Sequence, residues 1–215
     1  MNKFEVIPLF AIPLYRTSLG ALDPKLKQFI TDAECERMPA GNGSYTVDKY
    51  FLNSPELASL KKQIMDGAYH FIYDFLDCKN TMEFKMENSW INKHKPGDYS
   101  LSHWHGSSLI SGVYYVEVGE DAGDIVFHKD HRHQNLFNPI IEVGFNYTDT
   151  LDQTKMNVFN TDNFGLQPKN GDLLLFPSHL AHSVDENLSK KTRYSIAFNL
   201  FPRGTSGGKI NTLTV

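Results

Sequence analysis

The feature that most constrains the fold is a change of periodicity near residue 80. Before this point apolar residues recur at helical spacing, whereas after it short apolar runs alternate with turn residues such as Pro96-Gly97. Helices followed by many strands are typical of a helix-supported β-sandwich or barrel. We therefore expect a mainly β chain with N-terminal supporting helices (α+β). The expected strands span residues 84–93, 108–118, 124–127, 140–147, 155–160, 172–176 and 193–201.

Two helices are expected before the strands. Asp23-Pro24 supplies an N-cap and a proline at the first helical position, and the apolar spacing behind it predicts a helix to about Arg37. Ser54-Pro55 repeats the signal for a longer helix with one apolar face ending at Phe75. Residues 4–15 read as an extended, proline-punctuated arm. No repeat or linker is visible, so we expect a single domain over 1–215, with arm and helices in 1–80 and the β core in 84–202.

Composition excludes several classes of function. The 215 residues carry a net charge of −4, which gives no electrostatic signal for nucleic acid. No apolar run approaches the roughly 20 residues of a membrane span, and no secretory signal is visible. The two cysteines, Cys35 and Cys78, lie in segments that look helical and do not indicate a disulfide framework. We expect a cytoplasmic protein, with the N-terminal arm as an interface if the chain forms a homo-oligomer.

Three histidines are candidates for a metal site. His103 and His105 are separated by one residue before an expected strand, and alternate residues of an extended segment point to the same face. Neutral imidazole is the commonest side-chain metal ligand. His182 follows a second strand-like run far downstream. The chain has nine histidines, so a His-x-His pair by itself is equally compatible with polar surface positions.

Arg193 opens an apolar strand eleven residues after His182. A guanidinium at the mouth of a barrel strand is costly unless it is paired, and it suits bidentate binding of a carboxylate. Ser195 points to the same side and offers a hydroxyl to the same ligand. Alone, Arg193 is also compatible with an ordinary surface arginine.

The ordered set of motifs resembles the Fe(II)- and 2-oxoglutarate-dependent oxygenases, and more narrowly an oxygenase family of bacteria and phages with a His-x-His motif. The resemblance covers about residues 84–202 and extends weakly over the whole chain. It implies a double-stranded β-helix (jelly roll, cupin-like) core, with Fe(II), 2-oxoglutarate and O2 as cofactor and cosubstrates. Its motifs are Ser89–Asn92, His103-Trp104-His105, Ser111–Tyr115, Gly171–Ser178, His182 and Arg193–Asn199.

The resemblance also implies roles for single residues. His103 matches the first iron-binding histidine and His182 the distal one. Arg193 matches the basic residue that binds the far carboxylate of 2-oxoglutarate, and Tyr115 matches a tyrosine that hydrogen-bonds it. Further expected contacts are Ser195 at the same carboxylate, Ser111 lining the pocket, and Asn92 or Tyr99 at the near end of the cosubstrate.

His105 departs from the pattern, because most of the superfamily has Asp or Glu there to complete two histidines and one carboxylate. We expect His105 itself to be the third ligand. The alternative is a carboxylate from Asp98, Asp121 or Asp124, with His105 behind the ligands. Tyr114 is expected to pack in the core, and the histidines of 128–133 to be solvated in a loop. His179 is not expected to be the distal ligand, and His70 and His94 receive no role.

The expected activity is hydroxylation coupled to decarboxylation of the keto acid. Two other readings stay open: a three-histidine cupin-type metalloprotein that does not use 2-oxoglutarate, and a non-catalytic jelly-roll binding module. The prime substrate is not indicated; a protein side chain, a small metabolite and a nucleotide-linked molecule are all compatible with the sequence.

Overall fold

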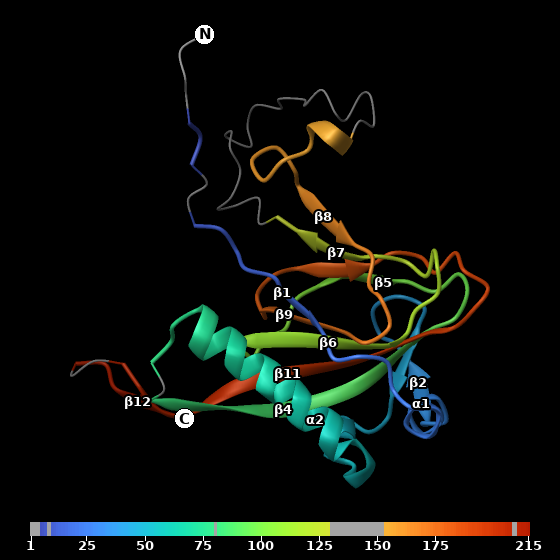
Figure 1. The fold of residues 1–215 in the computed structure, drawn as a ribbon, viewed down its shortest axis with the longest axis horizontal. Coiled ribbons are helices and arrows are strands. Elements are labelled where there is room, and N and C mark those ends of the chain that lie inside the picture. Colours follow the sequence, from blue (N-terminus) through green and yellow to red (C-terminus); the bar gives the residue numbers. More distant parts are fainter. Residues whose placement is uncertain (1–4, 8–9, 80, 130–152, 208–209) are drawn as a thin grey trace.

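The computed structural model describes residues 5–7, 10–79, 81–129, 153–207 and 210–215, and two antiparallel sheets form its frame (Figure 1). The large sheet has the order β1 (Tyr15–Ser18), β9 (Asp172–Pro177), β6 (Ile110–Glu117), β11 (Arg193–Ser206), β4 (Met82–His94), β3 (Ser44–Thr46) and β2 (Cys35–Arg37), and β12 (Leu213–Thr214) pairs with β11. The small sheet has the order β5 (Ser100–His103), β10 (His182–Val184), β7 (Ile125–His128) and β8 (Asn163–Leu166).

The strands of the large sheet bury both faces. On β9, Leu173 and Leu175 belong to a core shared with the helices, whereas Leu174 and Phe176 pack with residues of the small sheet. This is the period-two alternation of a strand covered on both sides. The side facing the small sheet is where the candidate site lies.

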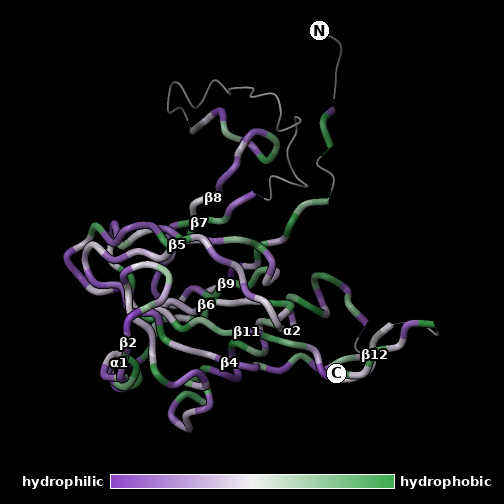
Figure 2. Tube along the Cα trace, turned by 180° about the vertical axis from the view of Figure 1, so that it is seen from behind, coloured by the Kyte–Doolittle hydropathy of each residue, from purple (hydrophilic) through white to green (hydrophobic). Residues whose placement is uncertain are grey.

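The helices cover the outer face of the large sheet. In α1 (Pro24–Thr31), the Asp23 carboxylate accepts hydrogen bonds from the backbone N–H groups of Lys25 and Leu26, at 2.9 and 3.0 Å. The long helix α2 (Ala58–Tyr69) follows two short 3-10 turns and continues as a π-helical stretch, His70–Phe75. Hydrophobic residues gather where α2 meets the sheet (Figure 2). The buried residues of this face are Leu57, Leu60, Ile64, Ala68, Phe71 and Ile72, as the sequence predicts, whereas Phe75, which was expected to end the face, is 66% exposed.

Several expected elements differ from the structure. The first helix ends at Thr31 rather than near Arg37, because Cys35–Arg37 pair with Ser44–Thr46 as a hairpin at the sheet edge. Cys35 therefore lies on a strand, and Cys78 lies after the π-helical stretch; both thiols are free.

Residues 155–160 are not a strand, because the Asn157 side chain accepts hydrogen bonds from the N–H groups of Phe159 and Asn160 and holds a turn. The strand comes later, at Asn163–Leu166, while the expected strand 140–147 lies outside the described residues. Within the described residues, no helix has both the length and the apolar character of a membrane span.

Candidate metal centre and adjoining cavity

Three imidazoles converge at the edge of the small sheet. His103 ends β5 and His182 begins β10, and the two residues are direct cross-strand partners. His105 lies two residues beyond β5, where its backbone N–H donates to the Ser178 carbonyl at 3.0 Å. The nearest ligand nitrogens of the three histidines all lie within 4.8 Å of one another. The predicted convergence is thus present, although only His103 of the His-x-His pair lies on a strand.

Backbone carbonyls orient two of these rings. Nδ1 of His103 lies 2.8 Å from the Leu101 carbonyl, and Nδ1 of His182 lies 3.0 Å from the Leu180 carbonyl. A carbonyl oxygen can only accept, so Nδ1 carries the proton and Nε2 presents its lone pair. A metal-ligating histidine generally has this arrangement, which fixes the tautomer and the ring orientation.

Burial keeps two of the imidazoles, those of His105 and His182, neutral. It lowers the pKa of His182 to about 3, with a further contribution from neighbouring His103, and it lowers the pKa of His105 to about 4. Phe176 packs edge-on against His182 at 4.8 Å between ring centroids, and Trp90 lies 5.8 Å from His105. Neutral imidazoles in an aromatic surround are ready to bind a cation without first losing a proton.

No carboxylate joins the three histidines among the residues that the structure describes. The carboxylate of Asp98 accepts a hydrogen bond from the Lys95 N–H at 2.8 Å, and Asp121 is exposed. Asp124 lies on the Arg193 side, where burial first and the neighbouring Asp185 second raise its pKa. Among the described residues, the cluster of candidate ligands therefore contains His105 and none of these three aspartates.

A cavity of about 380 Å³ adjoins the histidines. Alternate residues of three adjacent strands form its floor, as the period of a strand requires. The small sheet contributes His103, His182, Ile125 and Val184, and His105 reaches the cavity from the segment after β5. The floor residues are Asn88, Trp90, Asn92 and His94 of β4, Arg193, Ser195 and Ala197 of β11, and Ser111, Val113 and Tyr115 of β6.

Arg193 closes one end of this cavity. Its side chain is buried, with the residue only 2% exposed, and Nη1 donates to the carbonyls of Ala122 at 3.3 Å and Gly123 at 2.5 Å. The Arg193 guanidinium carbon lies 5.3 Å from the centroid of the Tyr115 ring. Burial raises the pKa of Tyr115 to about 12, although Arg193 opposes the shift, so the phenol keeps its proton. Both Arg193 Nε and the Tyr115 hydroxyl are buried, and neither has a hydrogen-bond partner in the part of the chain that the structure describes.

These two buried groups indicate whether the cavity could bind a dicarboxylic keto acid. Buried polar groups are normally hydrogen-bonded, and a buried guanidinium without a carboxylate is costly. An anionic ligand in the cavity would satisfy both groups. The residues present therefore fit a carboxylate at the Arg193 end and a cation at the histidine end.

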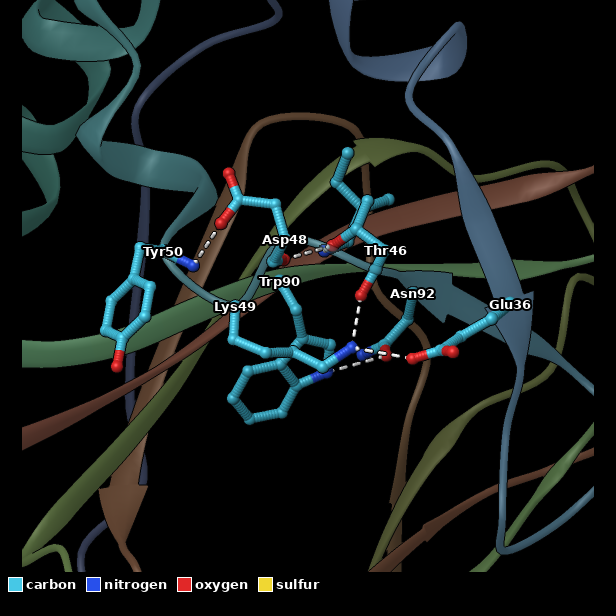
Figure 3. A network of polar contacts seen from close by, with 8 residues as sticks. Glu36, Thr46, Asp48, Lys49, Tyr50, Trp90 and Asn92 are labelled. Atoms are coloured by element: carbon cyan, nitrogen blue, oxygen red, sulfur yellow. Dashed lines mark hydrogen bonds and ion pairs between the residues drawn. The ribbon is translucent and has the colours of Figure 1, made fainter.

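The remaining predicted residues have mixed outcomes. Ser111, Ser195 and Asn92 line the cavity. The Ser111 hydroxyl lies 2.8 Å from Asn199 Oδ1, and the Asn92 side-chain oxygen accepts from Trp90 Nε1 at 2.9 Å (Figure 3). Tyr99 is 39% exposed and is not a lining residue. Tyr114 packs on the opposite face, as predicted, and its hydroxyl donates to the Gly20 carbonyl at 2.8 Å.

Two of the remaining histidines, His179 and His128, lie outside the cluster. His179 is exposed and stands outside the cluster. His128 was expected to be solvated in a loop, but it ends β7 and its ring nitrogens lie 2.7 Å from Asn163 Oδ1 and 2.9 Å from Ser183 Oγ. Residues 130–133 lie outside the described part.

Sequence reasoning missed two parts of the cavity. His94 lines it beside Arg193, and alternation along the expected strand would have placed it on the same face as Asn92. Lys49 also lines the cavity, and it donates to Glu36 at 3.2 Å and to the Thr46 carbonyl (Figure 3). Its ammonium lies 3.5 Å from the centre of the Tyr45 ring. No local sequence signal marks this network, because it joins two strands with the segment that follows β3.

A family model described as "Putative 2OG-Fe(II) oxygenase" matches residues 88–199, more than half of the chain. The chain belongs to this family of 2-oxoglutarate- and iron-dependent oxygenases. The predicted superfamily resemblance and enzyme class are confirmed, whereas the narrower origin in bacteria and phages stays a prediction. Iron is the metal of the oxygenase family, 2-oxoglutarate its cosubstrate and O2 its oxidant.

Solved structures show the same fold for the oxygenase. A 2OG-Fe(II) oxygenase family oxidoreductase from Burkholderia pseudomallei has a TM-score of 0.56 and 14% identity, covering 82% of this chain and 77% of its own. A Pseudomonas putida prolyl-4-hydroxylase has a TM-score of 0.56 and 14% identity, covering 90% and 94%. HygX from Streptomyces hygroscopicus, solved with nickel and 2-oxoglutarate, has a TM-score of 0.57 and 10% identity, covering 89% and 83%. Comparison with curated protein sequences gives no match. The predicted double-stranded β-helix is confirmed.

Proposed function

We propose that His103, His105 and His182 bind the iron of this oxygenase and that Arg193 binds the distal carboxylate of 2-oxoglutarate. One observation carries the proposal: three convergent imidazoles share a cavity with a buried guanidinium whose Nε has no hydrogen-bond partner among the described residues. The proposed outcome is hydroxylation of a prime substrate whose identity is open.

Each side chain has a defined task in this proposal. The Arg193 guanidinium supplies the charge that selects a dicarboxylate, and the protonated Tyr115 hydroxyl donates to the same carboxylate. Ser195, Ser111 and Asn92 contribute polar groups along the floor, while Phe176 and Trp90 limit water near the histidines. The bound iron supplies the oxidative chemistry on the keto acid and O2.

The proposal is tested by adding 2-oxoglutarate to the Fe(II)-loaded protein without oxygen and recording the visible spectrum. We expect a charge-transfer band that Arg193→Ala abolishes at moderate keto-acid concentration. Arg203→Ala is the matched control, because Arg203 lies on the same strand but is exposed and paired with Glu87 at 2.8 Å. Metal binding without any response to the keto acid would instead support the three-histidine cupin, and no metal binding would support a binding module.

The ligand set is tested separately at His105. His105→Ala should weaken metal affinity by more than about tenfold, since it removes one of three ligands. His179→Ala should leave the affinity unchanged, because His179 is exposed and outside the cluster. Wild-type affinity in His105→Ala would reassign the third position to a carboxylate.

We also place the protein in the cytoplasm as part of this proposal; its support is the pair of free cysteines, which suits a reducing compartment. A homo-oligomer formed through the N-terminal arm stays a prediction, and size-exclusion chromatography with light scattering tests it. Neither nucleic acid nor a membrane is proposed as a partner.

A further inference from the structure

His94 is a buried histidine that shares the cavity with Arg193. It ends β4, it is 1% exposed, and its direct cross-strand partner on β11 is Arg193 itself. His94 is not part of the histidine cluster, and the family description assigns it no role. Its position places an imidazole at the end of the cavity where the guanidinium lies.

The two ring nitrogens of His94 have different surroundings. Nε2 lies 2.9 Å from the Ser100 hydroxyl, and this edge of the ring packs so closely on Gly43 that a Cβ there would lie 2.9 Å from Cδ2. The Ser100 hydroxyl can donate either to Nε2 or to the Met38 sulfur at 3.4 Å. When a ligand acceptor lies beside Nδ1, the tautomer with the proton on Nδ1 is favoured, and the Ser100 hydroxyl then donates to Nε2 rather than to the weaker sulfur acceptor.

Nδ1 of His94 belongs to a set of buried polar atoms that have no hydrogen-bond partner. Within the described residues, three buried side-chain atoms lack a hydrogen-bond partner: His94 Nδ1, Arg193 Nε and the Tyr115 hydroxyl oxygen. All three residues line the same cavity, and they come from the adjacent strands β4, β11 and β6. Buried polar atoms without a partner are rare, so three of them on residues that line one cavity point to a shared ligand, and a ligand that accepts from all three would satisfy them.

A carboxylate matches this arrangement in charge and in number of acceptor sites. Its two oxygens offer about four lone-pair positions, enough for three donors. Burial and then Arg193 lower the pKa of His94 to about 4, so His94 adds a donor without adding a second buried charge. The other groups that act on Arg193 are Tyr115, Asp124 and Asp185, and the last two supply negative charge from the far side of the guanidinium.

We propose that His94 is a specificity-determining residue that donates from Nδ1 to the distal carboxylate of the keto acid, alongside Arg193 and Tyr115. The inference rests on the proposed function, because it assumes that this carboxylate binds at Arg193. In this proposal a residue of β4 helps to select the cosubstrate. The contacts of Ser100 and Gly43 with the Nε2 edge of the ring would then orient Nδ1 toward the ligand.

The test compares two keto acids on Ni(II)-loaded protein by isothermal titration calorimetry. 2-Oxoglutarate carries the distal carboxylate, whereas 2-oxovalerate has the same number of carbons and lacks it. His94→Leu should weaken 2-oxoglutarate binding by about tenfold, the scale of one hydrogen bond to a charged group, and leave 2-oxovalerate binding nearly unchanged. His94→Asn, whose amide can still donate, should recover most of the affinity, and His179→Leu is the surface control.

The outcomes separate the two proposals. If wild-type protein binds both keto acids equally, the assignment of Arg193 fails and His94 fails with it. If wild-type protein prefers 2-oxoglutarate but His94→Leu keeps that preference, only the His94 proposal is overturned. Equal losses for both keto acids would show a purely structural role and would also overturn it. Should His94→Leu not fold, His94→Met carries the comparison, because its flexible chain fills irregular space.

Discussion

Tyr114 and Tyr115 show how much one residue position decides on a strand. They are consecutive on β6 and both completely buried, yet the Tyr114 hydroxyl donates to a backbone carbonyl while the Tyr115 hydroxyl faces the cavity without a partner. The same chemical group is thus part of the packing on one face and a free donor on the other. We therefore predict that removing the hydroxyl affects ligand binding at Tyr115 and protein stability at Tyr114.

We expect Tyr115→Phe to leave the free energy of unfolding unchanged or slightly higher, because it removes an unsatisfied buried hydroxyl. The same change should weaken 2-oxoglutarate binding several-fold. Tyr114→Phe is the matched control: it should cost about 1 kcal/mol of stability through its lost hydrogen bond and leave binding unchanged. Urea denaturation and calorimetry on metal-loaded protein measure the two quantities. A clear loss of stability in Tyr115→Phe would mean that its hydroxyl is paired within the protein.

Residue chemistry also explains which site residues the sequence could reveal. His103, His105, His182 and Arg193 stand out because imidazole and guanidinium groups beside apolar strands are costly unless they have a task. His94 has the same chemistry, but it lies just after the Ser89–Asn92 motif rather than in it, and sequence reasoning assigned it no role. Only the pairing of β4 with β11 places it opposite Arg193, and that pairing spans almost a hundred residues of sequence.

At the scale of elements, the long strands were predictable, and of the short strands that build the site only β7, expected at 124–127 and found at Ile125–His128, was predicted. β4, β6, β9 and β11 carry their own apolar pattern and appear where expected. β5 and β10 have four and three residues, too few for a pattern, and they exist because each pairs with a neighbour distant in sequence. These two strands carry His103 and His182. The sequence therefore indicated which histidines could bind a metal but not the strands that bring them together.

The turn before β7 holds Arg193, and Gly123 makes that turn possible. Gly123 has φ +85°, and a Cβ at this position would lie 2.2 Å from the Asp185 carbonyl oxygen. Its own carbonyl accepts from Arg193. The turn therefore couples the small sheet to the guanidinium on the large one.

We expect Gly123→Ala to destabilise the protein by about 3 kcal/mol or more, because backbone must move as well as adopt a strained φ. It should also weaken 2-oxoglutarate binding by displacing Arg193. Gly20→Ala is the control: Gly20 has φ +82° with nothing within 4 Å of an added Cβ, so only the conformational cost of about 1 kcal/mol applies. Thermal denaturation and calorimetry compare the two variants, and similar losses in both would show that the Asp185 contact is unimportant.

At the scale of the whole molecule, the two sheets enclose polar groups that ordinary cores exclude. The α2 side of the large sheet is a hydrophobic core. The other side holds His94, His105 and His182, and burial lowers their pKa values to between about 3 and 4. The fold class follows from the sequence because the apolar pattern specifies it. Which polar groups are enclosed cannot be predicted from the sequence, because their burial depends on how the two sheets pack against each other.

The enclosed histidines make stability depend on pH in a defined direction. His94, His105 and His182 have native pKa values near 4, 4 and 3, below the ordinary value of 6.5. Between these limits the unfolded chain binds more protons than the native protein, so acid favours unfolding. Their contribution is complete above about pH 6.5 and declines as the pH falls toward 4. Asp124, with a raised pKa, opposes this only weakly and at the acid end.

We therefore expect the free energy of unfolding of the metal-free protein to fall continuously from pH 7 to pH 4.5, measured by urea denaturation at each pH. His94→Met should make the decline shallower by up to one proton, about 1.4 kcal/mol per pH unit. His179→Leu should keep the wild-type slope, because that histidine is exposed. A saturating divalent metal should steepen the decline, since protons compete with the metal for the same imidazoles. A metal-free protein with constant stability across this range would show that the three rings are accessible to water, and would remove the basis for an enclosed site.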